Sequence, residues 1–350
     1  MSGRYWVSKE GQKVNNCIFD KTILHILDAN LQVPILSIKE MNNEKDIDDF
    51  LKKHLSKIIN DSDLKNVLFE LNGNKIYDLC KKINLDKESF IDVSVELANM
   101  LFAIMKENPS IPSGDVVFAT FEDSGNNYFL LMKLNYRNSY MHYVSNTDQG
   151  NFNNLIKQKT TLPNETQKVE ECILINLSNF ECKILEKQYE ICGQKEYYLS
   201  KYFLKCVSEL SNSQKLKVLD KAVSKVNKKY FDEEFDKVSK FRTCLAEGIE
   251  ETNSIQVDLV AESVFGDNQQ IKKEYLEEVK KLGLVENIVE IPVTNSTTKK
   301  YRTQKLKTDS GIEINFPSNF YDNKELIEFI NNPDGTISIL IKNITKVINQ

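Results

Sequence analysis

The sequence predicts an α+β fold: an N-terminal mixed or antiparallel sheet with helices on one face, then a helical region, then a small C-terminal unit of a helix pair and strands. Two observations predict this order. Apolar strand-like runs separated by short turns gather between Asp115 and Gln188, after a set of amphipathic helical patterns. After Gly193 the apolar residues recur at helical spacing until about Glu250, and extended runs return only near the C-terminus.

The domain organisation follows from length and from one break in the helical pattern. A chain of 350 residues favours two packed units. Ser211-Asn212-Ser213 interrupts the helical region, with Ser213 as the expected helix cap. We therefore expect residues 1–17 to be a lead-in without regular structure, residues 18–210 to form the α+β domain, and residues 211–350 to form the helical and small-sheet C-terminal domain.

The expected elements of the first domain begin with a strand at Ile18–Leu27 and a weak edge strand at Val33–Ile38, which Pro34 interrupts. Apolar residues at helical spacing predict helices at Asn42–Asn60, Asp63–Phe69, Lys75–Ile83 and Asp86–Glu107. Turn residues then separate the strands of a meander, Asp115–Glu122, Asn127–Tyr136 and Tyr140–Ser145, and of a further hairpin, Glu171–Leu177 with Cys182–Gln188.

The second half of the chain reads as helices followed by two strands. The helices are expected at Tyr197–Leu210, Ser213–Tyr230, Glu233–Glu250, Ile255–Phe265 and Gln269–Leu282. The last two, hinged at Gly266, have the outline of a helix-turn-helix, but the second carries mixed charge, which does not favour a recognition helix. The closing strands are Ile312–Phe316 and Thr336–Ile341.

Composition excludes several classes of function. The formal net charge of -5 argues against bulk electrostatic attraction to DNA or to an anionic membrane, so nucleic-acid binding would need a local basic patch. No stretch approaches the roughly 18 apolar residues of a membrane span. The 7 cysteines are scattered without a C-x-x-C pair, as expected of reduced core residues in a cytosolic protein.

The sequence holds no catalytic or metal-binding signature, and we expect no cofactor. A P-loop, a dinucleotide fingerprint, an H-E-x-x-H motif and a nucleophile elbow are all missing from the sequence. Of the 3 histidines, His25 and His142 lie in apolar strands, where a structural role is expected. The one faint trace of a metal-dependent nuclease is Glu122-Asp123 at a strand end with Lys133 on the next strand.

Two basic stretches are the candidate nucleic-acid contacts. Between Thr294 and Lys307 the chain carries five cations and an aromatic with no acid, a pattern that can contact phosphates and stack on bases: Lys299, Lys300, Tyr301, Arg302, Lys305 and Lys307. A second set recurs every three or four residues on one helix face: Lys217, Lys221, Lys225 and Lys228. The alternatives are a charged edge strand that discourages aggregation and an ordinary solvated helix face.

Several passages resemble the bacterial NdpA-type nucleoid-associated proteins. They are Ile23-Leu24-His25-Ile26-Leu27-Asp28, Leu130-Leu131-Met132-Lys133-Leu134, Ile173-Leu174-Ile175-Asn176-Leu177 and the run from Tyr197 to Leu204, followed by the tail passages from Ile312 to Phe316 and from Asn332 to Ile341. The resemblance covers about Ile18 to Ile344. It implies a cytoplasmic, nucleoid-associated protein without an established enzymatic activity or cofactor, and it supplies no active-site residues.

The hypothesis for function is therefore a non-enzymatic protein of the nucleoid that binds DNA through a local basic surface with little sequence specificity. Two alternatives stay open. The first is an acidic protein-interaction or homodimerisation module that reaches the nucleoid through a partner and uses Ser213–Tyr230 and Glu233–Glu250 as its surface. The second is a metal-dependent nuclease around Glu122 and Asp123.

Overall fold

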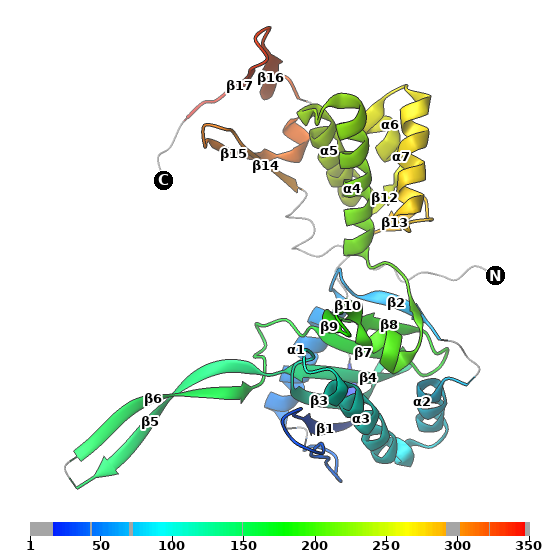
Figure 1. The fold of residues 1–350 in the computed structure, drawn as a ribbon, viewed down its shortest axis with the longest axis vertical. Helices are drawn as coiled ribbons and strands as arrows, with labels where there is room; N and C mark the ends of the chain where they lie inside the picture. The colour runs from blue at the N-terminus through cyan, green and yellow to red at the C-terminus, as the bar shows by residue number, and fades with distance from the viewer. Residues whose placement is uncertain are drawn as a thin grey trace. The chain divides into compact units, whose positions relative to one another are not determined.

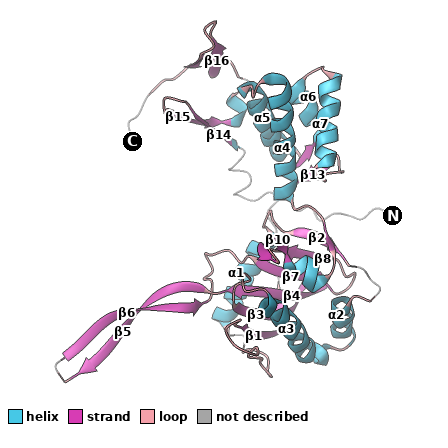
Figure 2. Ribbon diagram, viewed as in Figure 1, coloured by secondary structure: helices cyan, strands magenta, loops and turns pink. Residues whose placement is uncertain are grey.

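The chain folds into two compact units, the first ending at Glu209 and the second beginning at Leu210 (Figure 1). This computed structural model describes residues 17–42, 44–69, 73–148, 150–291, 302–321 and 323–346. Both units combine helices with strands, as the colours of Figure 2 show, so the α+β class is confirmed. No helix in these described ranges is long and apolar enough to cross a membrane.

A seven-stranded sheet is the frame of the first unit. Its strands run in the order β1-β3-β4-β7-β8-β2-β11, and every neighbouring pair is antiparallel. The central strands consist almost wholly of buried residues, as expected where both faces are covered. The strands are β1 (Ile18–Leu27), β2 (Lys65–Leu68), β3 (Gly114–Asp123), β4 (Asn126–Asn135), β7 (Glu171–Asn176), β8 (Cys182–Leu185) and β11 (Val207–Ser208).

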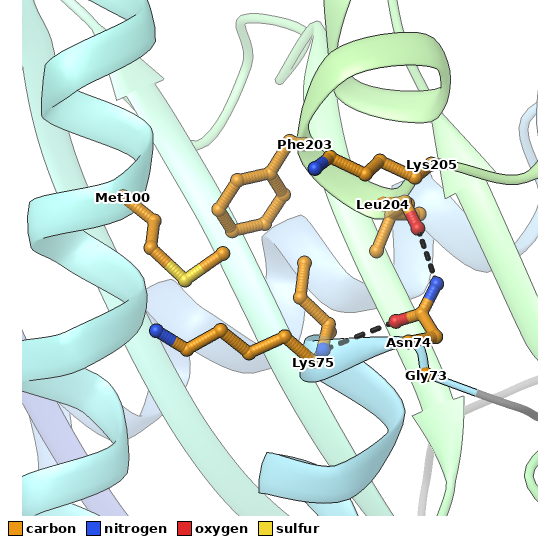
Figure 3. Close-up of a pocket in the computed structure, with 8 residues that line it drawn as sticks. Gly73, Asn74, Lys75, Met100, Phe203, Leu204 and Lys205 are labelled. Carbon is orange, nitrogen blue, oxygen red and sulfur yellow. Dashed lines mark hydrogen bonds between the residues drawn. The ribbon is translucent and has the colours of Figure 1, made fainter.

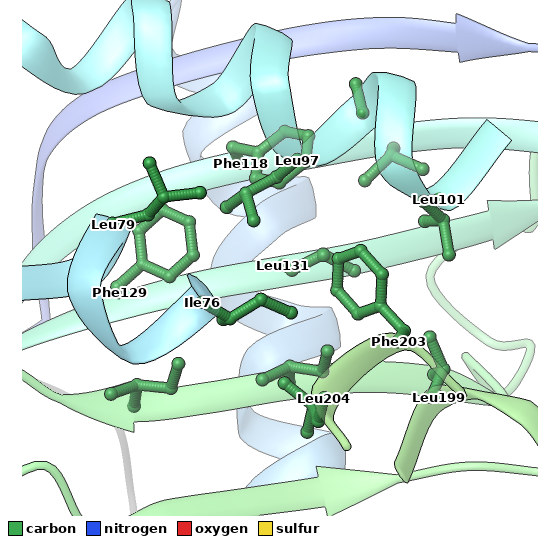
Figure 4. Packing of buried hydrophobic residues seen from close by; sticks show 14 of the residues in the cluster. Ile76, Leu79, Leu97, Leu101, Phe118, Phe129, Leu131, Leu199, Phe203 and Leu204 are labelled. Atoms are coloured by element: carbon green, nitrogen blue, oxygen red, sulfur yellow. The ribbon is translucent and has the colours of Figure 1, made fainter. Parts of the chain in front are cut away.

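Helices cover both faces of this sheet rather than the one face expected. On one face lie α2 (Lys75–Leu85), the short η1 (Lys87–Ser89), α3 (Phe90–Glu107) and the helical turn η2 (Leu199–Leu204). Figure 4 shows Leu97 of α3 beside Phe118 of β3, whereas Leu101 of the same helix lies nearer Phe203 of η2. On the other face α1 (Lys45–Ile59) buries its apolar stripe against Val117, the alternate side of the same strand.

Two expected helices in this unit are wrong. Asp63–Phe69 contains β2, because Lys65 and Val67 alternate inward and the strand fits between β8 and β11. There the Lys65 ammonium is buried 2.9 Å from the Glu186 carboxylate, a tertiary contact that local periodicity cannot reveal. The segment Tyr197–Leu210 contains the short helical turn η2 instead of a long helix. The chain then turns at Lys205, whose φ of 50° lies in the left-handed region, and continues into β11.

The third strand of the expected meander does not join the sheet. β5 (Arg137–Thr147) continues past the sheet edge and pairs only with β6 (Gly150–Thr161), a strand the sequence analysis did not identify. The two strands form a long ribbon that extends from the first unit, drawn in green in Figure 1. A smaller hairpin of β9 (Gln188–Ile191) and β10 (Gln194–Tyr197) follows β8.

Four helices surround the apolar core of the second unit. They are α4 (Asn212–Phe231), α5 (Phe235–Glu251), α6 (Val257–Phe265) and α7 (Gln269–Lys281), with the short pair β12 (Ser254–Gln256) and β13 (Ile288–Glu290). The cap of α4 is Ser211 rather than Ser213: the Ser211 hydroxyl accepts from the Gln214 N–H, and the Gln214 side chain accepts from the Ser211 N–H.

Two hairpins complete the second unit. They are β14 (Thr303–Lys307) with β15 (Glu313–Pro317), and β16 (Ile327–Asn331) with β17 (Ile337–Ile341), joined through the turn η3 (Ser318–Phe320). The expected closing strands are thus confirmed. A ring cluster joins both hairpins to the start of α5: the ring centroid of Phe329 on β16 lies 5.4 Å from that of Phe235 on α5 and 6.1 Å from that of Phe316 on β15.

Candidate nucleic-acid interface

The described part of the C-terminal basic stretch is a β-strand rather than a loop. Along β14, Gln304 is buried and Leu306 half-buried, whereas Lys305 and Lys307 alternate with them and are exposed. The strand pairs with β15, which sets Lys305 opposite Asn315 and Lys307 opposite Glu313. The pleat therefore directs both lysines to the solvent side of the hairpin.

Gln304 fixes this strand to α5. Its amide Nε2 donates to the Ser239 carbonyl at 3.3 Å and to the Thr243 hydroxyl at 3.4 Å, and the residue is fully buried. The Thr243 hydroxyl in turn donates to the Ser318 carbonyl at 3.2 Å, on the turn that follows β15. A buried side chain with these bonds holds the hairpin in one orientation, so the cations across the pleat stand on a rigid support.

The cations of this strand differ in their partners. Arg302 donates from Nε to the Glu250 carboxylate at 2.7 Å, and Lys307 lies 3.3 Å from Glu313. Lys305 makes no ion pair with any residue that the structure describes. Exposed pairs of this kind are worth only ~0–1 kcal/mol, so a phosphate can take the place of either carboxylate. Lys299, Lys300 and Tyr301 lie outside the described residues.

The α4 lysines form a face that is only partly available. Lys217 and Lys221 are exposed and make no ion pair within the described ranges. Lys225 instead lies 2.7 Å from Glu278 on α7, and Lys228 lies 3.1 Å from Glu233. The stripe expected from the sequence is therefore split into a free first half and a neutralised second half.

Glu274 of α7 strengthens this neutralisation. It accepts from Lys229 at 2.5 Å and also from the Tyr230 hydroxyl. The hydrogen bond from Lys229 is the main reason that the pKa of Glu274 lies below its usual value. Glu274 and Glu278 of α7 thus face α4, whereas Glu277 and several lysines of α7 are exposed.

Two of those cations were missed by the sequence reasoning. Lys273 and Lys280 are exposed on α7 and make no ion pair with described residues. The sequence of α7 has both acidic and basic residues, so it was not recognised as a basic surface. A count of charges does not show that Glu274 and Glu278 face another helix. A helical projection, which puts Glu274 and Glu278 on one side and Lys273 and Lys280 together on another, is the signal that could have found them.

The structure does not bring together the residues of the weak pattern that suggested a metal-dependent nuclease. Glu122 and Asp123 lie at the β3–β4 hairpin, where Asp123 pairs with Asn126. Lys133 lies near the opposite end of β4, buried against Glu171 at 2.7 Å. Throughout the described residues, no group of three His, Cys, Asp or Glu side chains is placed to hold a metal ion.

The histidines have the structural roles expected only in part. His25 is fully buried in β1, where Nδ1 accepts from the Ser37 N–H and Nε2 bonds to the Ser94 hydroxyl, both at 3.0 Å. His142 instead lies exposed on the β5–β6 ribbon and makes no core contact of this type. The expectation for His142 fails because β5 leaves the sheet.

A pocket of about 180 Å³ lies between the start of α2 and η2 (Figure 3). Asn74 closes one side of it: its side chain accepts from the Ile76 N–H at 3.0 Å and donates to the Leu204 carbonyl at 2.7 Å. Lys75 and Lys205 are the charged residues of its lining, and Lys75 pairs with Glu96 at 2.6 Å. The residues that line this pocket include no carboxylate, histidine, cysteine, serine or threonine.

Comparison with known proteins gives the class: this chain is a nucleoid-associated protein. A family model described as nucleoid-associated protein YejK matches residues 23–349. Because the match covers nearly the whole chain, the chain belongs to that family, and the resemblance drawn from its sequence passages is confirmed. No curated protein matches the chain.

Proposed function

We propose that this protein is a non-enzymatic component of the bacterial nucleoid in the cytoplasm, and that it binds duplex DNA through phosphate contacts from the β14 strand. The observation that supports the proposal most directly is the outward pair Lys305 and Lys307, held on a strand that Gln304 anchors to α5. Arg302 directly precedes the same strand. Lys299, Lys300 and Tyr301 immediately precede it in the sequence and extend the acid-free run.

The chemistry of such a surface favours binding without sequence readout. Lysine and arginine contacts to phosphates position a protein on the duplex but carry no base information. The chain as a whole has a net charge of -5, so attraction has to come from this local surface, and affinity falls steeply as salt is added. The exposed half of α4, Lys217 and Lys221, is the second contact, because Lys225 and Lys228 already have carboxylate partners.

The test removes the five cations of the acid-free run by alanine substitution and measures fluorescence anisotropy with a duplex of about 25 base pairs at several salt concentrations. Each lost phosphate contact lowers the slope of log affinity against log salt by about 0.9, so the loss of five contacts should lower the slope by up to about 4.5. At low salt we expect at least a tenfold loss of affinity. The substituted residues are Lys299, Lys300, Arg302, Lys305 and Lys307.

The matched control makes the same change of charge on the first unit. Five exposed lysines there make no ion pair with described residues: Lys39, Lys45, Lys81, Lys82 and Lys195. The variant with these five lysines replaced by alanine should bind DNA with an affinity within about threefold of the wild type and with the same salt slope. If the two variants lose affinity equally, β14 is not the contact. If neither the wild type nor a variant binds DNA, the alternative of recruitment to the nucleoid through a protein partner replaces this proposal.

A further inference from the structure

The pocket between α2 and η2 has no role in the proposed DNA contact, and its lining combines apolar side chains with cations. Ile76, Phe203 and Leu204 are buried, and Met100 of α3 is half-buried. The pocket volume of about 180 Å³ exceeds the roughly 150 Å³ of an apolar cavity that binds benzene. The pocket is therefore large enough to hold one six-membered ring against apolar side chains.

The walls of this pocket are joined before any ligand binds. The Asn74 side chain accepts from the Ile76 N–H at 3.0 Å and donates to the Leu204 carbonyl at 2.7 Å, as the dashed lines in Figure 3 show. Because Asn74 is buried and caps α2, these bonds tie the start of that helix to η2. A site whose walls are already held together loses little ordering entropy when a ligand enters.

Two lysines flank the apolar side chains of the pocket. Lys75 is the first residue of α2, and Lys205 follows η2 with a φ of 50°, in the left-handed region. Non-glycine residues seldom adopt this backbone conformation, and those that do are concentrated at functional sites. In Figure 3 the side chains of Met100 and Phe203 lie between those of the two lysines. A ligand that contacts Met100 and Phe203 would therefore have an ammonium group on either side.

The charges around the pocket leave one positive charge unbalanced. Lys75 lies 2.6 Å from Glu96 of α3, whereas Lys205 is exposed and makes no ion pair within the described ranges. Two ammonium groups and one carboxylate leave a net charge of +1, which a monocarboxylate would neutralise. A phosphate monoester carries about −1.5 to −2 charges at neutral pH and would exceed that balance. The charge of the pocket therefore favours a singly charged anion.

We propose that this pocket binds a small aromatic monocarboxylate, with its ring against Met100 and Phe203 and its carboxylate at Lys205. A methionine sulfur and a phenylalanine ring both make favourable contacts with an aromatic ring. The Lys205 ammonium donates a charge-assisted hydrogen bond to the carboxylate at the exposed side of the pocket. The pocket lies in the first unit and the proposed DNA contact in the second, so the two proposals succeed or fail separately.

The experiment measures the fluorine NMR line width of 3-(4-fluorophenyl)propanoate, at increasing concentrations, in the presence of the full chain without DNA. The neutral amide, 3-(4-fluorophenyl)propanamide, has nearly the same shape, so comparing the two ligands isolates the effect of the carboxylate charge. A ligand of this size reaches at best a high micromolar to millimolar affinity, so we expect the carboxylate to bind with a dissociation constant below about 3 mM. The amide should bind at least about fivefold more weakly.

Three substitutions test whether the ligand occupies the pocket. Met100→Trp adds bulk at a half-buried position of the lining, so it should weaken binding of the carboxylate at least about tenfold. Lys205→Gln removes the unpaired ammonium and should weaken binding of the carboxylate at least about threefold, while binding of the amide stays the same. Glu96→Gln releases Lys75 from its ion pair and should strengthen binding of the carboxylate about twofold. Circular dichroism melting curves show whether each variant is folded.

The matched control is Lys195→Gln, which removes an equal charge from an exposed position of β10 outside the pocket. It should change the dissociation constant of the carboxylate less than about 1.5-fold. The proposal is overturned if the wild type does not bind the carboxylate, if the carboxylate and the amide bind equally, or if Lys205→Gln and Lys195→Gln have equal effects. A folded Met100→Trp variant that binds like the wild type overturns it as well.

Discussion

The ammonium of Lys225 lies 2.7 Å from the carboxylate of Glu278, and this ion pair joins α4 to α7. Glu278 is buried, whereas Lys225 reaches out to it from the exposed side of α4. The pair shows why counting lysines along a helix overstates its attraction for phosphates. The attraction of a helix for phosphates depends on the lysines that are not already paired with carboxylates of neighbouring helices.

Removing that carboxylate should increase DNA binding. Glu278→Gln keeps the shape of the side chain and frees Lys225, so we expect a two- to fivefold gain in affinity at low salt and a salt slope steeper by up to about 1. The measurement is the anisotropy titration described above. The control is Glu277→Gln on the same helix, which removes an equal charge from an exposed position that has no ion-pair partner in the described ranges. Equal gains in the two variants would mean that only net charge matters and that Lys225 makes no contact.

The sequence located the secondary structure of the sheet core better than it located the exposed strands. The buried strands β3, β4 and β7 are near-continuous apolar runs with turn residues at their ends, so local patterns suffice to find them. β6 has no such pattern, because neither of its faces packs on a core and its residues are mostly Asn, Lys, Gln and Thr. A strand whose only stabilisation is its partner strand leaves little periodic signal in the sequence.

The candidate interface shows the same limit. The acid-free run was visible in the sequence, but the role of Gln304 as an anchor was not, since it depends on Ser239 and Thr243 more than 60 positions away. The pairing of Arg302 with Glu250 is equally non-local. Sequence patterns therefore identified which residues are basic, whereas tertiary contacts decide which of them are presented on a rigid support.

His25 should make the first unit sensitive to acid. Burial lowers the pKa of this histidine from 6.5 to about 4, because the charged imidazolium would lose its hydration. The neutral ring leaves Nδ1 unprotonated, and Nδ1 accepts from the Ser37 N–H. The unfolded chain binds this proton near pH 6.5 and the folded chain only near pH 4. The contribution of neutral His25 to the free energy of unfolding is therefore fully present above about pH 6.5. It decreases as the pH drops toward 4, by up to about 3 kcal/mol.

The measurement is the free energy of unfolding in urea at pH 7.5 and pH 5. His25→Gln is less stable than the wild type at pH 7.5, but it should lose less stability between the two pH values. His142→Gln, which removes an imidazole from the exposed ribbon, is the control and should follow the wild type. A wild type and a His25→Gln variant with the same pH dependence would show that His25 does not titrate in this range.

The buried pair of Lys133 and Glu171 should show a large non-additive effect on stability. Lys133 is fully buried in β4, 2.7 Å from Glu171 on β7, and it also donates to the Pro112 carbonyl at 2.9 Å. Burial lowers the pKa of Lys133, and the adjacent carboxylate opposes that shift. Removing either partner alone leaves a buried charge without its partner, so Lys133→Met and Glu171→Leu should each cost about 3–5 kcal/mol in unfolding free energy.

The double variant Lys133→Met with Glu171→Leu separates this explanation from a simple loss of packing. With both charges gone the desolvation penalty disappears as well, so the double variant should cost clearly less than the sum of the single variants, by at least about 2 kcal/mol. Urea unfolding at pH 7 measures all three. The matched exposed pair, Lys75 and Glu96, should show no such coupling when changed in the same way, because water screens those charges. Additive costs at Lys133 and Glu171 would show that packing around β4 and β7, rather than the paired charges, determines the loss.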